Sequence, residues 1–243
     1  MGSRGRSPAR LPLRAAEVHV WRATLDLAPP SLRACARLLD ADEQARAKRL
    51  RSPGHRRRFV AAHGFVRTVL GRYLAVPPET IRFSPGPHGK PVLVPPFDGE
   101  SVHFNLSHSH GLALCAIARG REVGVDIERV RTGAAALAIA ARFFSPREQA
   151  ALRALPAAAV YPAFFRLWTC KEAYVKATGA GISRALRTVE VQLGRRTPRL
   201  RVADDPQAAR WSLRELRPPR GYAAALAVEG RGWRLSCRRW RAP

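Results

Sequence analysis

The order of its secondary-structure signals constrains this chain more than any other feature. Residues 17–27 alternate apolar and polar side chains, as a strand does, and residues 31–50 have helical spacing. A second helix is expected from about residue 55 to residue 74. Short strand-like segments follow, at residues 80–85, 90–95, 102–107 and 112–118. This half of the chain predicts helices that cover a small sheet.

A similar order of signals starts again after about residue 120. A strand is expected at residues 123–130, then helices around residues 134–142, 146–155 and 162–178. Strand candidates follow near residues 186–193, 198–203, 210–216, 222–229 and 232–238. We expect an α+β fold with a flexible N-terminus at residues 1–15, one half at residues 16–121 and a second half at residues 122–243. The two halves do not repeat visibly in sequence.

The formal net charge of +25 over 243 residues raises nucleic acid or an anionic membrane surface as a partner. However, the arginines are spread from end to end, without a recognition module or interleaved aromatic residues, so a bias of composition explains the charge better. The longest weakly charged runs are far below the ~20 residues that cross a bilayer. We expect no nucleic acid and no membrane, but phosphate-bearing small molecules or acidic proteins as partners.

The four cysteines are widely spaced and form neither a CxxC pair nor a zinc-ligand pattern with histidine. A disulfide framework and a structural zinc site are therefore not expected. A reducing cytoplasm is the compartment that fits this cysteine usage.

Two acids share one face of the strand expected at residues 123–130. Its apolar residues alternate with Gly124, Asp126 and Glu128, so both carboxylates lie on the face opposite the apolar one. Their Cα atoms are ~6.5 Å apart, from where both side chains can reach one hard cation. Mg²⁺ takes oxygen ligands and commonly binds one or two carboxylates together with substrate phosphates. The alternative is an ordinary, half-exposed acidic strand.

Lysine is rare in this chain, with four lysines against 39 arginines, and two of the four lie in residues 167–181. If residues 162–178 form one helix, Glu172 and Lys176 lie on one stripe with Lys171 beside it. A compact ammonium reaches one oxygen as a point charge, which a planar guanidinium does poorly. The alternative is a Glu172–Lys176 pair near the end of the helix, worth a few tenths of a kcal/mol.

Together these segments resemble a known family. GVDIE at residues 124–128 and FRLWTCKEAYVKATGAGI at residues 165–182 look like the two motifs of the 4′-phosphopantetheinyl transferases, in the class built from two similar halves. Supporting matches are GPHGKPVL at residues 86–93, HFNLSHSHGLALCAI at residues 103–117 and RFFSPRE at residues 142–148. The resemblance covers most of residues 40–185.

The resemblance implies a fold and an activity. The fold is a pseudo-dimer of two similar α+β halves, each a small, mostly antiparallel sheet packed with helices, in a class that is usually monomeric. Members move the phosphopantetheine arm of coenzyme A to a serine hydroxyl of an apo acyl or peptidyl carrier protein and release adenosine 3′,5′-bisphosphate. Such carriers serve fatty-acid, polyketide or nonribosomal-peptide synthesis. Mg²⁺ is the expected metal, with Mn²⁺ as the alternative, and coenzyme A is the co-substrate.

The resemblance also implies roles for individual residues. Asp126, Glu128 and Glu172 would be the carboxylates that face the metal, and Lys171 and Lys176 would contact the phosphates of coenzyme A. The other positions that match coenzyme contacts are Arg46, Arg58, Lys90, Ser107 and His108. Arg46 and Arg58 align with basic positions used for the 3′-phosphate, and a solvated basic face is the alternative for them.

Glu148 and Glu172 are the two candidates for the base that takes the proton of the serine hydroxyl. The alternative for Glu148 is an exposed acid at a helix start, stabilised by the helix dipole. The alternative for His108 is a turn histidine that is hydrogen-bonded after a strand. Two other functions stay open at this point, which are nucleic-acid binding and a catalytically silent binder of coenzyme A.

Overall fold

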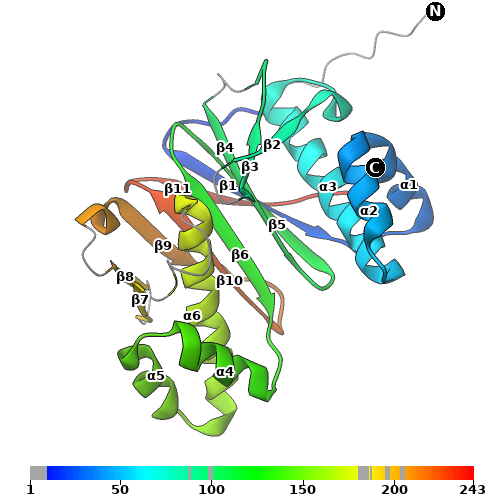
Figure 1. Cartoon of the computed structure of the whole chain (residues 1–243). Coiled ribbons are helices and arrows are strands. Elements are labelled where there is room, and N and C mark those ends of the chain that lie inside the picture. Colours follow the sequence, from blue (N-terminus) through cyan, green and yellow to red (C-terminus); the bar gives the residue numbers. More distant parts are fainter. Residues whose placement is uncertain are drawn as a thin grey trace, which may run out of the picture.

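The computed structural model of this protein describes residues 10–86, 89–97, 101–179, 186, 188–194, 198–202 and 206–243. Within these ranges the chain forms two main sheets, two short hairpins and six α-helices (Figure 1). The expected α+β class, with small and mostly antiparallel sheets packed with helices, is confirmed. None of the described helices is long and apolar enough to span a membrane.

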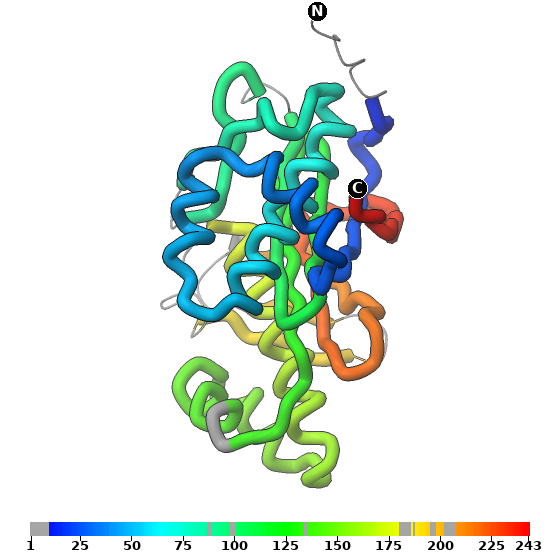
Figure 2. Tube along the Cα trace, turned by 90° about the vertical axis from the view of Figure 1, so that its right-hand side faces the viewer, coloured from blue at the N-terminus to red at the C-terminus, as the bar shows by residue number. Residues whose placement is uncertain are grey.

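The first sheet has the strand order β11-β1-β5-β4. Its strands are β1 (Glu17–Thr24), β4 (Val102–Ser109), β5 (Leu112–Arg119) and β11 (Arg234–Arg239). Helix α3 (Pro53–Leu74) covers one face, where Phe65 packs in a buried cluster with Trp21 and Ile117. Helices α1 (Pro29–Leu38) and α2 (Ala41–Arg49) pack against α3, and Figure 2 shows these three helices in front of the strands.

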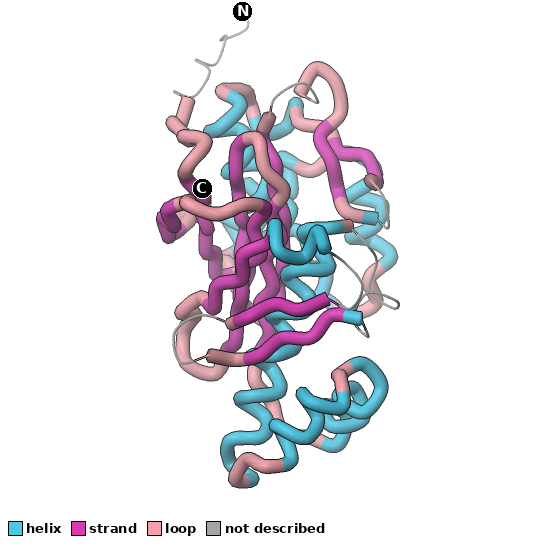
Figure 3. Tube along the Cα trace, turned by 90° about the vertical axis from the view of Figure 1, so that its left-hand side faces the viewer, coloured by secondary structure: helices cyan, strands magenta, loops and turns pink. Residues whose placement is uncertain are grey.

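The second sheet has the strand order β6-β10-β9 and is antiparallel. Its strands are β6 (Val123–Arg129), β9 (Trp211–Glu215) and β10 (Tyr222–Glu229). Helix α6 (Ala157–Thr178) covers one face and buries Phe164, Ala173 and Tyr174 there. Helices α4 (Ala134–Phe143) and α5 (Pro146–Arg153) lie beyond the ends of the sheets, and strands β7 (Val189–Gln192) and β8 (Arg199–Val202) form a hairpin (Figure 3).

The uncovered faces of the two sheets pack against each other. Val20 and Ala116 of the first sheet share a buried cluster with Val125 and Leu226 of the second. The molecule therefore has four layers, in the order helix, sheet, sheet, helix, and strands β4 and β6 become neighbours at their edges. Because Val125 faces the first sheet, the alternate residues of β6 face α6.

The last strand departs from the expected division of the chain. Strand β11 runs parallel to β1, with Cys237 paired to Val20, so residues 234–239 lie in the sheet of the first half. Trp240 then packs on Phe65, with 5.3 Å between the ring centroids. Alternation in the sequence predicted the strand itself, but a pairing between the two ends of the chain leaves no local signal. The boundary at residue 121 stays a prediction.

The prediction of one helix over residues 31–50 was wrong, because the helix is interrupted at Leu39 and Asp40. The Asp40 side chain accepts a hydrogen bond from the Glu43 backbone at 2.9 Å, and the Glu43 side chain accepts one from the Asp40 backbone at 3.1 Å. This reciprocal capping box starts α2 as a new helix. Helix α6 also starts earlier than expected, directly after Pro156.

The remaining described elements are short. They are the 3₁₀ turns η1 (Pro78–Thr80) and η3 (Pro206–Arg210) and the hairpin strands β2 (Phe83–Pro85) and β3 (Pro91–Leu93). The connection between these two hairpin strands is only partly described, since residues 87–88 lie outside the described ranges.

Candidate active site

Helix α6 lies directly on strand β6 because Gly124 has no side chain. A Cβ atom at Gly124 would be 2.1 Å from the carbonyl oxygen of Ala173 and 2.4 Å from the amide nitrogen of Ala177. Both are backbone atoms, so no side-chain rotation could relieve the overlap. This close approach places Glu172 and Lys176 of the helix beside Asp126 of the strand.

Asp126 is the centre of the resulting cluster and is only 2% exposed. Its Oδ1 accepts hydrogen bonds from Lys176 Nζ at 2.6 Å and from Ser107 Oγ at 2.8 Å. Its Oδ2 is buried and receives no donor from the described residues, and the same holds for Oε1 of Glu172, which is 5% exposed. Buried carboxylate oxygens without a partner are costly. These two oxygens are therefore free to bind a cation.

Three polar side chains of β4 join this strand to β6. Backbone N–H groups of every second residue of β6 donate to them: Val125 to Asn105 Oδ1 at 2.9 Å, Ile127 to Ser107 Oγ at 3.3 Å and Arg129 to Ser109 Oγ at 3.1 Å. The two serine hydroxyls in turn donate to Asp126 and to Glu128, the latter at 2.7 Å. These bonds orient both carboxylates. The three residues recur at every second position, which is the period of a strand. This spacing could have pointed to all three residues, but our prediction named only Ser107 among them.

The acids and Lys176 influence one another electrostatically. Burial, followed by the negative charge of Asp126, raises the pKa of Glu172 to about 7. The pKa of Glu128 is also raised, mainly by burial. For Lys176 burial acts in the opposite direction, but the charges of Asp126, Glu172 and Glu128 outweigh it and raise the pKa. Three acids and one ammonium therefore form a single cluster with an excess of negative charge.

The raised pKa of Glu172 predicts a stability effect in the metal-free protein. The folded state keeps this proton up to about pH 7, whereas an unfolded chain loses it near pH 4.5. Folding stability from this group is therefore lost as the pH rises from 4.5 to 7, by about 3 kcal/mol in full. We expect Glu172→Gln to raise the free energy of unfolding at pH 8 by roughly 1–3 kcal/mol, measured by urea denaturation in a chelator.

The gain should shrink below pH 5, where the wild-type carboxyl becomes protonated in the unfolded state as well as in the folded state. Glu79→Gln, at an exposed acid of η1, is the matched control and should change little at either pH. Equal stability of Glu172→Gln and the wild type at pH 8 would contradict the burial of a charged Glu172.

The residues of the cluster fit a hard divalent cation such as Mg²⁺. The described part of the chain holds no set of three His, Cys, Asp or Glu side chains already closed around one point. The cluster nevertheless offers only oxygen ligands, and two of these oxygens are buried and receive no donor from any residue that the structure describes. Its excess negative charge favours a cation. Asp126, Glu128 and Glu172 are the residues that would hold it.

The structure does not bring Glu148 and Lys171 to this cluster. Lys171 is fully buried and donates to Glu148 Oε2 at 2.7 Å, while Oε1 of Glu148 accepts from the backbone N–H of Val191 at 2.8 Å. Glu148 also accepts from the backbone of Ser145 and closes a capping box at the start of α5. Burial lowers the pKa of Lys171, and the acids that oppose this shift are Glu148 and Glu190. This ion pair fastens α5 and β7 to α6.

Breaking this ion pair on one side should destabilise the fold. Lys171→Met leaves the Glu148 carboxylate buried without its counter-charge, and we expect a loss of about 3 kcal/mol in the free energy of unfolding. The double variant Lys171→Met, Glu148→Gln should recover part of it. Arg166→Gln is the control, because it breaks an ion pair with Glu215 in which the arginine side chain is 45% exposed. Such an exposed pair contributes less than about 1 kcal/mol to the free energy of unfolding. Equal losses for Lys171→Met and Arg166→Gln in denaturant melts would contradict this reading.

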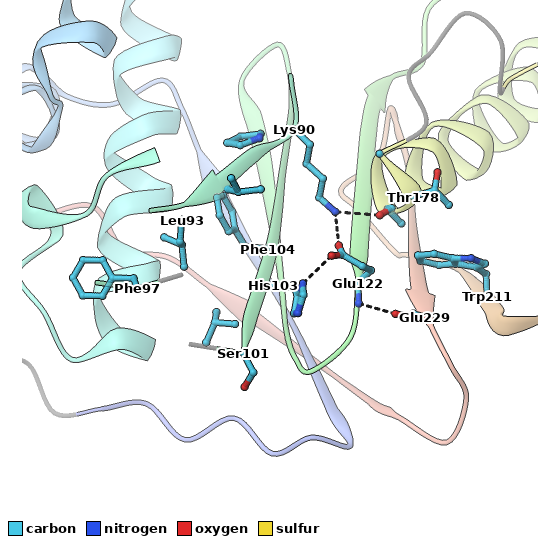
Figure 4. Close-up of a pocket in the computed structure, with 15 residues that line it drawn as sticks. Lys90, Leu93, Phe97, Ser101, His103, Phe104, Glu122, Thr178, Trp211 and Glu229 are labelled. Carbon is cyan, nitrogen blue, oxygen red and sulfur yellow. Dashed lines mark hydrogen bonds and ion pairs between the residues drawn. The ribbon is translucent and has the colours of Figure 1, made fainter. Parts of the chain in front are cut away.

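Lys90 lies at the C-terminal end of α6, where it lines a cavity of about 480 Å³ (Figure 4). Its ammonium donates to Glu122 at 2.7 Å and to the carbonyl of Ala177 at 3.1 Å. Glu122 also pairs with His103 at 3.0 Å. The other walls of the cavity are largely apolar and include Val92, Leu93, Phe97, Phe104 and Trp211.

The remaining predicted residues lie on the side of the first half. His108 is on the outer side of β4, where surrounding protein atoms partly desolvate the ring; this, with the charges of His63 and Lys176, lowers its pKa. Arg46 lies over the Phe59 ring at 5.6 Å. Arg58 is held by Asp26 through two hydrogen bonds of 2.9 and 3.3 Å. The charge of Lys176 therefore acts on His108, whereas the Arg58 guanidinium is paired with Asp26.

Comparison with known proteins identifies the family. Residues 122–227 match the model of the 4′-phosphopantetheinyl transferase superfamily. The chain is also 45% identical over 226 residues to the 4′-phosphopantetheinyl transferase HetI of Nostoc sp., a match that covers 93% of each chain. The chain belongs to the 4′-phosphopantetheinyl transferases. This confirms the resemblance drawn from GVDIE and FRLWTCKEAYVKATGAGI.

Other relatives of this 4′-phosphopantetheinyl transferase match a shorter part of it. The 4′-phosphopantetheinyl transferase Sfp of Bacillus subtilis is 36% identical over 128 residues, which are 53% of this chain and 54% of Sfp. Among solved structures, the holo-[acyl-carrier-protein] synthase of Thermotoga maritima has a TM-score of 0.38 and 22% identity, over 45% of this chain and 63% of that chain.

Proposed function

We propose that this protein transfers the 4′-phosphopantetheine arm of coenzyme A to a serine hydroxyl of an apo acyl or peptidyl carrier protein and releases adenosine 3′,5′-bisphosphate. The observation that carries the proposal is the cluster of Asp126, Glu128 and Glu172 beside the ammonium of Lys176, in which two buried carboxylate oxygens have no donor among the described residues. The family membership of the chain supports the same reaction.

The proposed reaction is a phosphoryl-group substitution that needs positioning and charge neutralisation more than covalent help. The serine oxygen attacks the β-phosphorus of coenzyme A, and the bond from this phosphorus to the oxygen of the leaving adenosine bisphosphate breaks. A divalent ion, when bound by the three carboxylates, supplies positive charge at the pyrophosphate. Lys176 supplies a second positive charge from the helix side, and its side chain is 27% exposed.

Glu172 is our candidate for the base that takes the serine proton. It lies on the same helix stripe as Lys176, and its carboxylate at the metal, or a water that it holds, can accept the proton. Glu148 is held by Lys171 and by two backbone N–H groups, so we assign it to the fold and not to the proton transfer. Ser107 would act by orienting Asp126, and His108 by contacting the coenzyme beside Lys176.

Intact-mass spectrometry tests the proposal most simply. Purified apo carriers from fatty-acid, polyketide and nonribosomal-peptide systems are incubated with the protein, coenzyme A and Mg²⁺. We expect a mass gain of one phosphopantetheine on at least one carrier and no gain in chelator. A protein that binds coenzyme A but modifies no carrier of the panel would be the silent binder, and the proposal would be rejected.

A further inference from the structure

The ammonium of Lys90 joins segments from both halves of the molecule. Lys90 precedes strand β3 in the first half, and its Nζ donates to Glu122 Oε2 at 2.7 Å, Ala177 O at 3.1 Å and Val123 O at 3.4 Å. Figure 4 shows the side chain extended towards Glu122 and the end of α6. The Lys90 side chain is only 15% exposed. It therefore occupies a defined position between β6 and α6.

Within the described helix, Ala157–Thr178, no backbone N–H group lies far enough along the chain to donate to the carbonyl of Ala177 in the helical pattern. Helix α6 ends at Thr178, and Gly179 takes the left-handed conformation with φ 66° and bonds to Val175 O. The carbonyls of the last turn have no following N–H group inside the helix, and they form the negative end of its dipole. An ammonium at this place satisfies a carbonyl and opposes the dipole charge. Lys90 is therefore a C-terminal cap supplied from another part of the chain.

The cap lies next to the candidate active site along the chain. Ala177 directly follows Lys176, whose ammonium is 2.6 Å from Asp126. On the strand side, Glu122 directly precedes β6 and Val123 is its first residue, and β6 is the strand that carries Asp126 and Glu128. Lys90 thus ties the beginning of β6 to the end of α6, and these are the two elements that must stay in register for the cluster to exist.

We infer that Lys90 is a positioning residue, which with Glu122 fixes the last turn of α6 on β6 and so holds Lys176 at Asp126. The inference rests on the proposed function for its kinetic consequence, but not for its structural one. It differs from the expectation that the Lys90 ammonium contacts coenzyme A directly. It also accounts for a lysine in this arginine-rich chain, because a tetrahedral ammonium can serve three separate acceptors around one point.

Steady-state kinetics of Lys90→Met, Lys90→Arg and Glu122→Gln separate positioning from direct contact. If Lys90 positions α6, Lys90→Met should lower kcat about tenfold or more and change KM for coenzyme A less than about threefold. Glu122→Gln should lower kcat in the same direction, and Lys90→Arg should recover part of the loss. If the ammonium binds a coenzyme phosphate, Lys90→Met should instead raise KM, and Glu122→Gln should lower KM because it removes a competing charge. That second pattern would overturn the inference.

Hydrogen exchange of the protein without coenzyme A tests the cap independently of activity. We expect the amides of residues 175–179 to exchange at least about tenfold faster in Lys90→Met and Glu122→Gln than in the wild type, with amides of α3 unchanged. Glu79→Gln, an exposed acid-to-amide change, should leave both regions unchanged. Unchanged exchange at the end of α6 would overturn the inference even if the protein is an active transferase. Faster exchange in a protein that modifies no carrier would reject the proposed function and leave the cap intact.

Discussion

Gly124→Ala is expected to cost this protein at least about 3 kcal/mol of its free energy of unfolding and roughly 6–12 °C in Tm. The new Cβ would lie 2.1 Å from Ala173 O, 2.4 Å from Ala177 N and 2.8 Å from Ala177 Cα, so the helix backbone itself must retreat from the strand. A retreat of α6 separates Lys176 and Glu172 from Asp126. We therefore also expect at least about 100-fold slower carrier modification, measured on whatever folded protein remains.

Gly54→Ala is the matched control for this substitution. Gly54 lies in the first turn of α3, and the nearest atom to a Cβ there would be Ser52 Oγ at 3.8 Å, an ordinary contact. Alanine is the better helix former, so the free energy of unfolding should stay within about 0.5 kcal/mol or rise. If Gly124→Ala and Gly54→Ala melt at the same temperature, the close contact between α6 and β6 is not a determinant of the fold.

Asp126→Asn is expected to abolish carrier modification, with at least about a 1000-fold loss of kcat/KM. The amide keeps the shape of the side chain, but it removes the negative charge that attracts a divalent ion and pairs with Lys176. The variant should nevertheless fold, because an isosteric group remains to accept from Ser107. Initial rates from intact-mass time courses, with thermal melts of the same samples, measure both properties.

Asp42→Asn serves as the control for that variant, since Asp42 is an exposed acid in the first turn of α2. It should keep the wild-type rate. Near-wild-type modification by a folded Asp126→Asn protein would contradict the role of Asp126, whereas loss of activity together with loss of the melting transition would only report on folding. Asp126→Glu then decides, because it restores the charge and should recover part of the rate if charge is what matters.

Local periodicity predicted which side chains of the candidate site share a face, and the family resemblance joined the two faces into one site. Alternation along β6 placed Asp126 and Glu128 on one face, and helical spacing placed Glu172 and Lys176 on one stripe. The structure brings these two elements into contact, as the resemblance implied. The N-x-S-x-S spacing of β4 carried a further signal of the same kind, since Asn105, Ser107 and Ser109 all reach β6.

What could not be predicted depends on contacts between residues far apart in the sequence. Lys171 is adjacent to Glu172, yet consecutive residues of a helix point about 100° apart, so it pairs with Glu148 on another side of α6. Lys90 donates to the carbonyl of Ala177, 87 positions further along the chain, and β11 pairs with β1, which lies near the opposite end of the chain. None of these pairings can be predicted from periodicity, because the period of the apolar residues indicates which face of an element is buried and not which other element packs on that face.

We propose that Asp126, Glu128 and Glu172 together bind one divalent ion. Titration of the metal-free protein with Mn²⁺ in the presence of coenzyme A, followed by electron paramagnetic resonance of the free ion, measures this directly. We expect one bound ion per chain in the wild type and in Asp42→Asn, and none at the same concentrations in Asp126→Asn and Glu172→Gln. One ion bound with unchanged affinity in both of the latter variants would contradict it.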